Sequence, residues 1–225
     1  MKQVTKNFGV GVLGCGVISN TYLDFIPLFK GLETRAVADI SPDAAKKQAS
    51  KYGVPAQGVE QLLANRHVDI ILNLTIPEVH YQTTKSIIEA GKHAYSEKPL
   101  VLDVPNGLDL QALAKKNGVQ VGCAPDTFLG GVHQQARKLI DDQEIGTITS
   151  GTCHVLSAGM ESWHPNPDFF FRPGGGPILD LGPYYIANLI SLIGPVSRVT
   201  AFASTPSAER TIGSGVRKGQ KVPVT

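Results

Sequence analysis

A glycine-rich turn near the amino terminus constrains the fold more than any other stretch of this 225-residue sequence. Residues 8–10 are apolar, residues 11–19 form the glycine-rich stretch, and a helical pattern follows from residue 20. Strand, glycine turn and helix in this order are typical of a phosphate-binding loop, because glycine lets the backbone bend sharply and approach a pyrophosphate. The free N–H groups and the dipole of the following helix then face the phosphate charge.

A carboxylate follows the turn at the spacing that a dinucleotide-binding fold requires. The next strand-like run, residues 33–38, ends in Asp39, about 20 residues beyond the glycines, where such a fold holds the adenosine ribose hydroxyls. Asp39 favours NAD over NADP, because its charge would repel a 2′-phosphate. Ser19 occupies the third glycine position, where a small side chain keeps helix and strand close. The alternative interpretation is a tight turn followed by a surface aspartate.

Composition and charge limit the class of protein. Apolar residues make up 42 % and charged residues 18 %, as in a soluble globular protein, and a net charge of +2 does not indicate a nucleic-acid partner. The most apolar late stretch, 178–193, is interrupted by Asp180 and Pro183, so it does not predict a membrane span. The three cysteines are isolated, which predicts a reduced, cytoplasmic protein without a disulfide framework or a zinc site. We also expect no secretory signal before the first strand.

Strand-like and helix-like runs alternate from residue 8 to residue 124. Residues 68–74 are almost continuously apolar, as in a strand buried on both faces of a parallel sheet. Shorter strand patterns cover 93–96 and 119–124, and helical patterns cover 79–90 and 104–116. The alternation predicts an α/β fold in which residues 1–124 form a Rossmann domain with a doubly wound parallel sheet.

A second domain is predicted over residues 125–225, after a hinge at 125–127. Helical patterns cover 129–140 and 177–193, strand-like alternation covers 147–157 and 196–204, and residues 213–220 indicate a hairpin turn. This pattern predicts an α+β domain with a mainly antiparallel sheet. Because so few strands make an incomplete layer, we expect the sequence to stop within this domain.

Four motifs then point to one protein family. They are Gly14-Cys15-Gly16, Thr75-Ile76-Pro77 with His80, Glu97-Lys98-Pro99-Leu100, and the glycine-rich stretch 174–182 that contains Asp180. With these motifs the whole chain resembles the Gfo/Idh/MocA oxidoreductases, which include glucose–fructose oxidoreductase, inositol dehydrogenase and many sugar dehydrogenases. The resemblance implies a second domain whose open sheet makes oligomer contacts, and therefore a homo-oligomer, either a dimer or a tetramer.

The resemblance also implies the position of the cofactor, NAD. It places the nicotinamide near Thr75, Pro77 and His80, with Glu97 and Lys98 beside it. Strand ends are suitable positions, since ligands in open α/β sheets lie beyond the carboxyl ends of the strands. The remaining members of the expected cofactor site come from the glycine turn and the second strand: Gly14, Cys15, Gly16, Val17, Ile18 and Asp39.

Three residues are candidates for the chemistry. Lys98 is the expected acid/base, because a proton must leave the hydroxyl as hydride leaves carbon; the alternative is a solvated lysine paired with Glu97. The resemblance assigns Asp180 to substrate hydroxyls and to positioning near the catalytic lysine, although an aspartate near a helix start can also interact with the helix dipole. Tyr184 lies four residues later, so the two side chains are predicted to share a helix face. Many relatives have histidine here, and whether Lys98 or Tyr184 transfers the proton stays open.

These expectations describe an enzyme that transfers a hydride between a nicotinamide dinucleotide and a secondary alcohol of a sugar or polyol, with no nucleic-acid or membrane partner. The alternative is a dinucleotide-sensing regulator without catalysis, since a fungal galactose-regulon repressor resembles the same family. Lys98 and Asp180 favour the enzyme, because a sensor needs neither a base nor a substrate-orienting acid.

Overall fold

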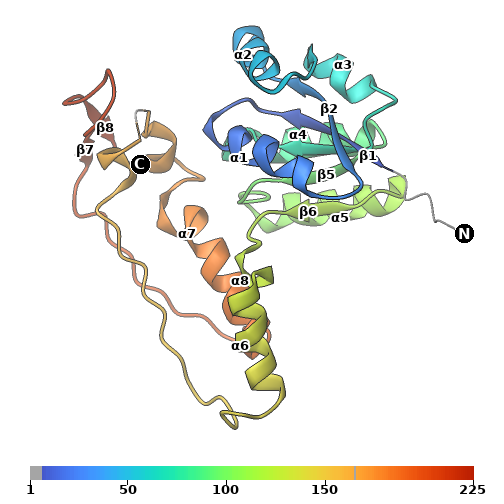
Figure 1. The fold of residues 1–225 in the computed structure, drawn as a ribbon. Helices are drawn as coiled ribbons and strands as arrows, with labels where there is room; N and C mark the ends of the chain where they lie inside the picture. Colours follow the sequence, from blue (N-terminus) through green and yellow to red (C-terminus); the bar gives the residue numbers. More distant parts are fainter. Residues whose placement is uncertain (1–6, 165) are drawn as a thin grey trace, which may run out of the picture. The chain divides into compact units, whose positions relative to one another are not determined.

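The computed structural model describes residues 7–164 and 166–225, which divide into two compact units (Figure 1). The first unit ends at Ala124 and the second begins at Pro125. Each unit has its own secondary structure and its own packing, and each is described by itself.

Six parallel strands form the sheet of the first unit, and their order is β3-β2-β1-β4-β5-β6. This is the strand order of a doubly wound dinucleotide-binding fold, so the predicted fold class is confirmed. The chain reverses its direction of winding between β1 and β4, and ligands of such folds bind beyond the carboxyl ends of the strands at this point. The strands are β1 (Phe8–Leu13), β2 (Leu32–Ala38), β3 (Ala56–Gln57), β4 (Ile70–Asn73), β5 (His93–Ser96) and β6 (Val121–Cys123).

Helices cover both faces of this sheet (Figure 1). Successive side chains of β1 point to opposite faces of the sheet. Val10 and Val12 pack with Leu23 of α1 on one face. Leu13 packs with Leu62 of α3 on the other face. The helices are α1 (Val17–Phe25), α2 (Pro42–Tyr52), α3 (Val59–Ala64), α4 (His80–Glu89) and α5 (Val104–Asn117), with short 3₁₀ turns η1 (Ile26–Leu28) and η2 (Pro77–Val79).

Local signals set the helix bounds. Ser41 caps α2, because its hydroxyl accepts a hydrogen bond from Ala44 N at 3.4 Å, and Pro42 occupies the first turn. Gly53 ends the same helix in the left-handed conformation, with φ of 66°. Both ends of α2 therefore follow from residues next to them in the sequence.

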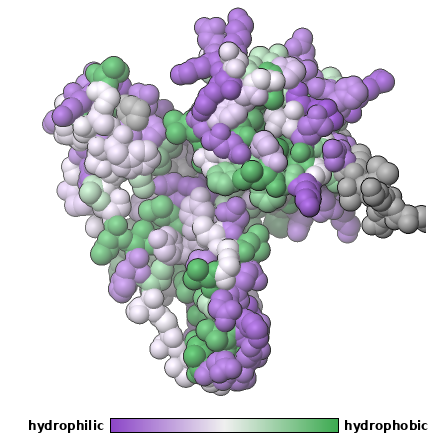
Figure 2. Space-filling view, in the orientation of Figure 1, coloured by the Kyte–Doolittle hydropathy of each residue, from purple (hydrophilic) through white to green (hydrophobic). Residues whose placement is uncertain are grey.

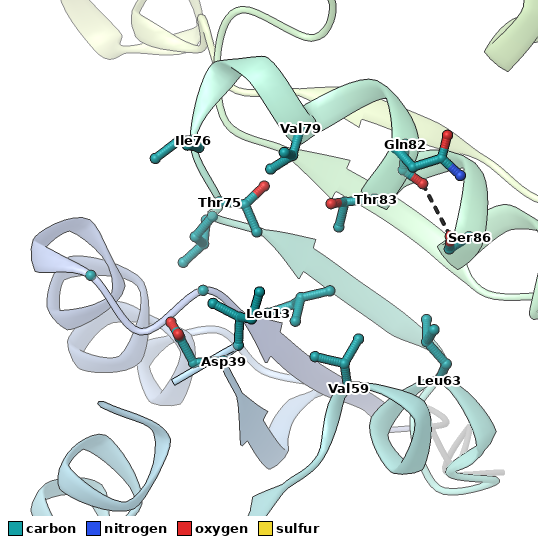
Figure 3. A pocket seen from close by; sticks show the side chains of 14 residues that line it. Leu13, Asp39, Val59, Leu63, Thr75, Ile76, Val79, Gln82, Thr83 and Ser86 are labelled. Carbon is teal, nitrogen blue, oxygen red and sulfur yellow. Dashed lines mark hydrogen bonds between the residues drawn. The ribbon is translucent and has the colours of Figure 1, made fainter. Parts of the chain in front are cut away.

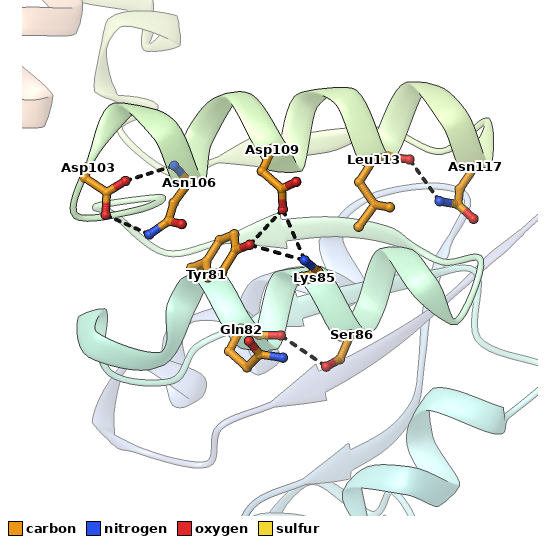
Figure 4. A network of polar contacts seen from close by, with 9 residues as sticks. All are labelled: Tyr81, Gln82, Lys85, Ser86, Asp103, Asn106, Asp109, Leu113 and Asn117. Atoms are coloured by element: carbon orange, nitrogen blue, oxygen red, sulfur yellow. Dashed lines mark hydrogen bonds and ion pairs between the residues drawn. The ribbon is translucent and has the colours of Figure 1, made fainter.

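A surface network joins α4 to α5 (Figure 4). Tyr81 Oη donates to Asp109 Oδ2 at 2.7 Å, and Lys85 Nζ donates to the same oxygen at 3.3 Å. The hydrogen bonds from Tyr81 and Lys85 lower the pKa of Asp109. These contacts attach α4, which follows β4 at the ligand-binding edge, to the neighbouring helix.

The second unit contains three helices, three 3₁₀ turns and one antiparallel strand pair among its described residues. The pair β7 (Glu209–Thr211) and β8 (Lys221–Pro223) encloses the predicted turn at 213–220, which is confirmed. None of the helices in the described ranges is long and apolar enough to cross a membrane. The helices are α6 (Gly131–Asp141), α7 (Gly176–Asp180) and α8 (Gly182–Ile193), and the turns are η3 (Thr127–Leu129), η4 (Met160–Ser162) and η5 (Asp168–Phe171).

The strands predicted at 147–157 and 196–204 are wrong, because both segments are irregular in the structure. Alternating apolar and polar residues are compatible with a strand that has one buried face. A strand forms, however, only where a neighbouring strand supplies partners for its backbone hydrogen bonds. Hydrophobic side chains of these segments are correspondingly exposed, Leu156 at 93 % and Phe202 at 98 %. Figure 2 shows hydrophobic surface on this unit.

The single helix predicted over 177–193 is also wrong, because the structure divides it at Leu181 into α7 and α8. Pro183 explains the break. It has no N–H group to donate, and its ring would clash with the carbonyl group four residues earlier in a continuous helix. Asp180 therefore ends one helix and Tyr184 lies in the next, so the two residues do not belong to one continuous helix as predicted.

Candidate active site

The glycine turn lies at the carboxyl end of β1 and leads into α1. Gly14 has φ of +106°, and a Cβ atom there would lie 2.5 Å from Leu74 O, so only glycine fits this close approach to the strand end of β4. Gly16 precedes the first turn of α1, where no side chain caps the helix among the described residues. A Cβ atom at Gly16 would meet nothing within 4 Å. The open space beside the helix start therefore suits an anionic group.

Asp39 is held beside this turn by two backbone donors. Its Oδ2 accepts from Cys15 N at 2.7 Å, and its Oδ1 accepts from Ser41 N at 2.8 Å. Each carboxylate oxygen retains further capacity to accept, so the group can also receive hydrogen bonds from ribose hydroxyls. The arrangement fits the role expected of Asp39.

Ser19, at the third glycine position, is completely buried. Its Oγ donates to Gly16 O at 2.6 Å and accepts from Gln48 Nε2 of α2 at 2.7 Å. The small serine side chain therefore fits at the third glycine position, where its hydroxyl links the start of α1 to α2.

A pocket of about 630 Å³ opens beside the glycine turn (Figure 3). Gly14, Gly16 and Asp39 line it on the side of β1 and β2. Apolar groups from β1 and α3 and polar groups from α4 complete the wall, which suits a flat heterocycle with polar edges. These groups include Leu13, Val59, Leu63, Gln82, Thr83 and Ser86, and the turn after β4 adds Thr75 and Ile76.

A buried asparagine organises the turns that follow β4 and β5. Asn73 Oδ1 accepts from Thr75 Oγ1 at 2.6 Å and from Thr75 N at 3.3 Å, and Asn73 O accepts from Glu97 N at 2.9 Å. Glu97 is also held by Tyr22 of α1, whose hydroxyl donates to Oε1 at 2.8 Å. In the sequence, the only indication of this role of Asn73 was a polar residue within an apolar strand. The pattern around Tyr22 did not distinguish it from a core residue.

Lys98 lies in the turn after β5 and is half-buried. Its backbone N donates to Glu97 Oε2 at 3.1 Å, and a cis peptide bond joins it to the buried Pro99. Thr75 and Pro77 lie in the turn after β4, where Pro77 begins η2. The structure thus places these candidate cofactor residues at adjacent strand ends, since β4 pairs with β5 through Asn73 and Ser96.

His80 differs from the other candidate cofactor residues. Its side chain is only 1 % exposed, and its two ring nitrogens face the carbonyl oxygens of Thr75 and Pro99. Both polar atoms of the ring are therefore engaged with the backbone.

Asp180 and Tyr184 belong to the second unit, and both are half-buried. The glycines before α7 allow close backbone packing, because a Cβ atom at Gly175 would lie 2.3 Å from Phe169 O. Tyr184 N donates to Leu181 O at 3.2 Å in the first turn of α8. The pairing of either residue with Lys98 stays a prediction.

The two cysteines of the first unit should react slowly with alkylating agents. Burial, together with the Asp39 charge, raises the pKa of the Cys15 thiol to about 11, and burial raises the pKa of Cys123 to about 11. Because the thiolate is the nucleophile, both groups should be unreactive at neutral pH and react faster as pH approaches 11. Peptide mapping after iodoacetamide treatment should find Cys153, which is exposed, modified first. Faster labelling of Cys15 would contradict this assignment.

Comparison with known proteins agrees with this architecture. The sequence profile of an oxidoreductase family with an NAD-binding Rossmann fold, Gfo/Idh/MocA, matches residues 8–124, and the profile of a C-terminal domain of this family matches residues 133–220. The fold and the site define a dinucleotide-binding Rossmann unit followed by a second unit. The chain belongs to the Gfo/Idh/MocA oxidoreductase family.

The relatives of this chain are named for different substrates. Inositol 2-dehydrogenase/D-chiro-inositol 3-dehydrogenase of Lactiplantibacillus plantarum is 32 % identical over 155 residues, which are 64 % of this chain and 42 % of that protein. 1,5-anhydro-D-fructose reductase of Ensifer adhaerens is 26 % identical over 218 residues, 93 % of this chain and 64 % of that protein. The chain spans about half the length of the curated relatives it matches.

A solved structure extends the likeness of fold to both units. The WlbA dehydrogenase of Bordetella pertussis, in complex with NADH and UDP-GlcNAcA, aligns with a TM-score of 0.77. The alignment covers 98 % of this chain and 67 % of that one at 20 % sequence identity, a level at which the likeness concerns the fold.

Proposed function

We propose that the protein is an NAD-dependent dehydrogenase that oxidises a secondary alcohol of a sugar or polyol, or reduces the corresponding ketone. The observation that carries the proposal is the juxtaposition, at the switch point of the sheet, of the glycine turn, the Asp39 carboxylate and the turn that bears Lys98. Family membership and relatives named as inositol dehydrogenase and anhydrofructose reductase support the substrate class.

The residues of the first unit fit the cofactor. Gly14 and Gly16 leave the backbone open for the pyrophosphate, Asp39 accepts from the adenosine ribose, and the pocket against α3 and α4 receives the adenine ring. We assign Cys15, Val17 and Ile18 to the phosphate turn, and Thr75, Pro77 and Glu97 to the nicotinamide end. When bound, the nicotinamide ring supplies the hydride acceptor or donor.

In this mechanism Lys98 moves the proton. Its amine accepts the hydroxyl proton as the carbon is oxidised, and its ammonium returns a proton to the carbonyl oxygen in the reverse direction. Asp180 binds substrate hydroxyls and orients the ring, and Tyr184 donates to a substrate oxygen.

Replacing Asp39 by asparagine should weaken the preference for NAD. The single carbonyl oxygen of the substituted side chain can still accept from Cys15 N, whereas its amide group cannot accept from Ser41 N, and the negative charge that opposes a 2′-phosphate is lost. We expect the NAD-to-NADP preference to fall about tenfold or more, equal to about 1.4 kcal/mol. Fluorescence titration with NADH and NADPH measures this ratio, and an unchanged ratio would remove Asp39 from cofactor selection.

The function is tested by following reduced-nicotinamide absorbance with NAD and NADP against aldoses, inositols and their phosphates. Asp180→Asn and Tyr184→Phe accompany the wild type, and each should lower kcat, because each loses a group placed at the substrate. Dinucleotide binding without any turnover across this panel would favour the dinucleotide-sensing regulator instead.

A further inference from the structure

His80 makes two contacts that the proposed chemistry does not use. Its Nε2 lies 2.9 Å from Thr75 O, and its Nδ1 lies 2.6 Å from Pro99 O. The first oxygen belongs to the turn after β4, and the second belongs to the turn that carries Lys98. A single buried ring at the start of α4 therefore spans the two turns at the proposed nicotinamide end.

The chemistry of the ring makes the shorter contact a hydrogen bond. A carbonyl oxygen only accepts, so a ring nitrogen that carries a proton donates to the carbonyl oxygen it faces, and the contact of Nδ1 with Pro99 O, at 2.6 Å, is the shorter of the two. A ring with protons on both nitrogens would donate to Thr75 as well. On the shorter distance we assign a proton to Nδ1, so that Nδ1 donates to the Pro99 carbonyl oxygen.

The backbone of His80 is anchored to the same place. Asn73 Nδ2 donates to His80 O at 3.2 Å and to Thr84 Oγ1 at 3.0 Å, and Asn73 O accepts from Glu97 N at 2.9 Å. Asn73 and Thr84 are completely buried. The ring thus extends from a fixed point, so its contact with Pro99 can set the position of the neighbouring Lys98.

We propose that His80 is a positioning residue for Lys98, which holds the Lys98 turn in place through the Pro99 carbonyl. The inference rests on the proposed function, which makes Lys98 the proton-transfer group. It replaces the expectation that the His80 ring contacts nicotinamide. Positioning matters because a displacement of about 1 Å at a reacting group can lower the rate about 10²-fold.

Two substitutions separate positioning from packing. His80→Asn is smaller but retains a donor at the δ position, whereas His80→Phe fills the space of the ring but offers Pro99 no donor. If His80 positions Lys98, the phenylalanine variant has the larger defect; if the ring only fills space, the asparagine variant does. Ile87→Val is the matched control, because Ile87 is completely buried in the same helix and packs in a core cluster with Leu62 and Ile71, away from the residues of both turns.

Amide hydrogen exchange measures how firmly the two turns are held, and it requires no substrate. The amides of Thr75, Glu97 and Lys98 all have partners within the polar framework around Asn73 and Glu97. In His80→Phe, these amides should exchange about tenfold faster or more, while amides of β1 keep the protection of the wild type. Ile87→Val should leave exchange at both turns unchanged. Unchanged exchange in a folded His80→Phe variant would overturn the proposal.

Kinetics with the substrate found in the activity screen supply the second readout. His80→Phe should lower kcat about 10²-fold while the dissociation constant for NADH stays at the wild-type value. A weakened affinity for NADH with unchanged kcat would overturn the proposal, because His80 would then serve the cofactor. If the turn loosens but Lys98→Met retains full turnover, the proposed function fails and the structural contact stands.

Discussion

Replacing Lys98 by methionine is expected to lower hydride transfer by about 10²- to 10⁴-fold, the usual contribution of a positioned acid or base. Methionine is similar in length but can neither accept nor donate the hydroxyl proton. The backbone of residue 98 should keep its hydrogen bond to Glu97, so the turn remains in place. The measurement is kcat at saturating substrate, together with the dissociation constant for NADH, which should not change.

Lys115→Met provides a matched control, because Lys115 is exposed in the last turn of α5 and lies outside the residues assigned to the site. It should retain the kcat of the wild type. Equal turnover in Lys98→Met and Lys115→Met would exclude Lys98 as the proton-transfer group and direct attention to Tyr184. A loss of kcat in Lys98→Met accompanied by a loss of NADH binding would assign Lys98 to cofactor binding instead.

Replacing Gly14 by alanine is expected to damage both the fold and cofactor binding. The new Cβ would lie 2.5 Å from Leu74 O and 2.9 Å from Thr75 N, and φ of +106° is unfavourable for any residue with a side chain. We expect the free energy of unfolding to fall by about 2–4 kcal/mol from strain and overpacking. Urea denaturation measures the loss, and NADH titration should show weakened binding because the turn is displaced.

Two other glycines separate the causes of this effect. Gly53→Ala has strain without a clash, since φ is 66° and nothing lies within 4 Å, and should cost about 1–2 kcal/mol. Gly16→Ala has neither, so its stability should fall by less than about 1 kcal/mol. Its NADH affinity should nevertheless fall, because the added methyl group occupies the space proposed for the pyrophosphate. Tight NADH binding by Gly16→Ala would place the pyrophosphate elsewhere.

Some residues of the candidate site could be predicted from the sequence, and others could not. The glycine turn and Asp39 were identifiable because each is constrained by its own backbone position at the end of a strand. His80 was visible as part of a motif, but its burial between two carbonyl oxygens depends on where the turns after β4 and β5 meet. Tyr22 showed only helical spacing, yet its hydroxyl holds Glu97 from 75 residues away along the chain.

The second unit shows the limit of local patterns more directly. Alternation at 147–157 and 196–204 predicted strands, but alternation describes only which side chains could share a face. Whether backbone groups find partners depends on segments distant in sequence, and neither segment forms a regular strand here. The break at Leu181, by contrast, follows from Pro183 and was open to prediction from the residue alone.

The sequence by itself determined the doubly wound sheet and the glycine turn after its first strand, because these depend on the periodicity of apolar residues and on the backbone geometry of glycine. Only the tertiary structure decided that Asp39 is held by the backbone of Cys15 and Ser41, that Asn73 joins two turns, and that His80 is enclosed. The physical reason is that a polar side chain takes its role from the partners that folding brings within hydrogen-bond distance, and these partners come from other strands and helices.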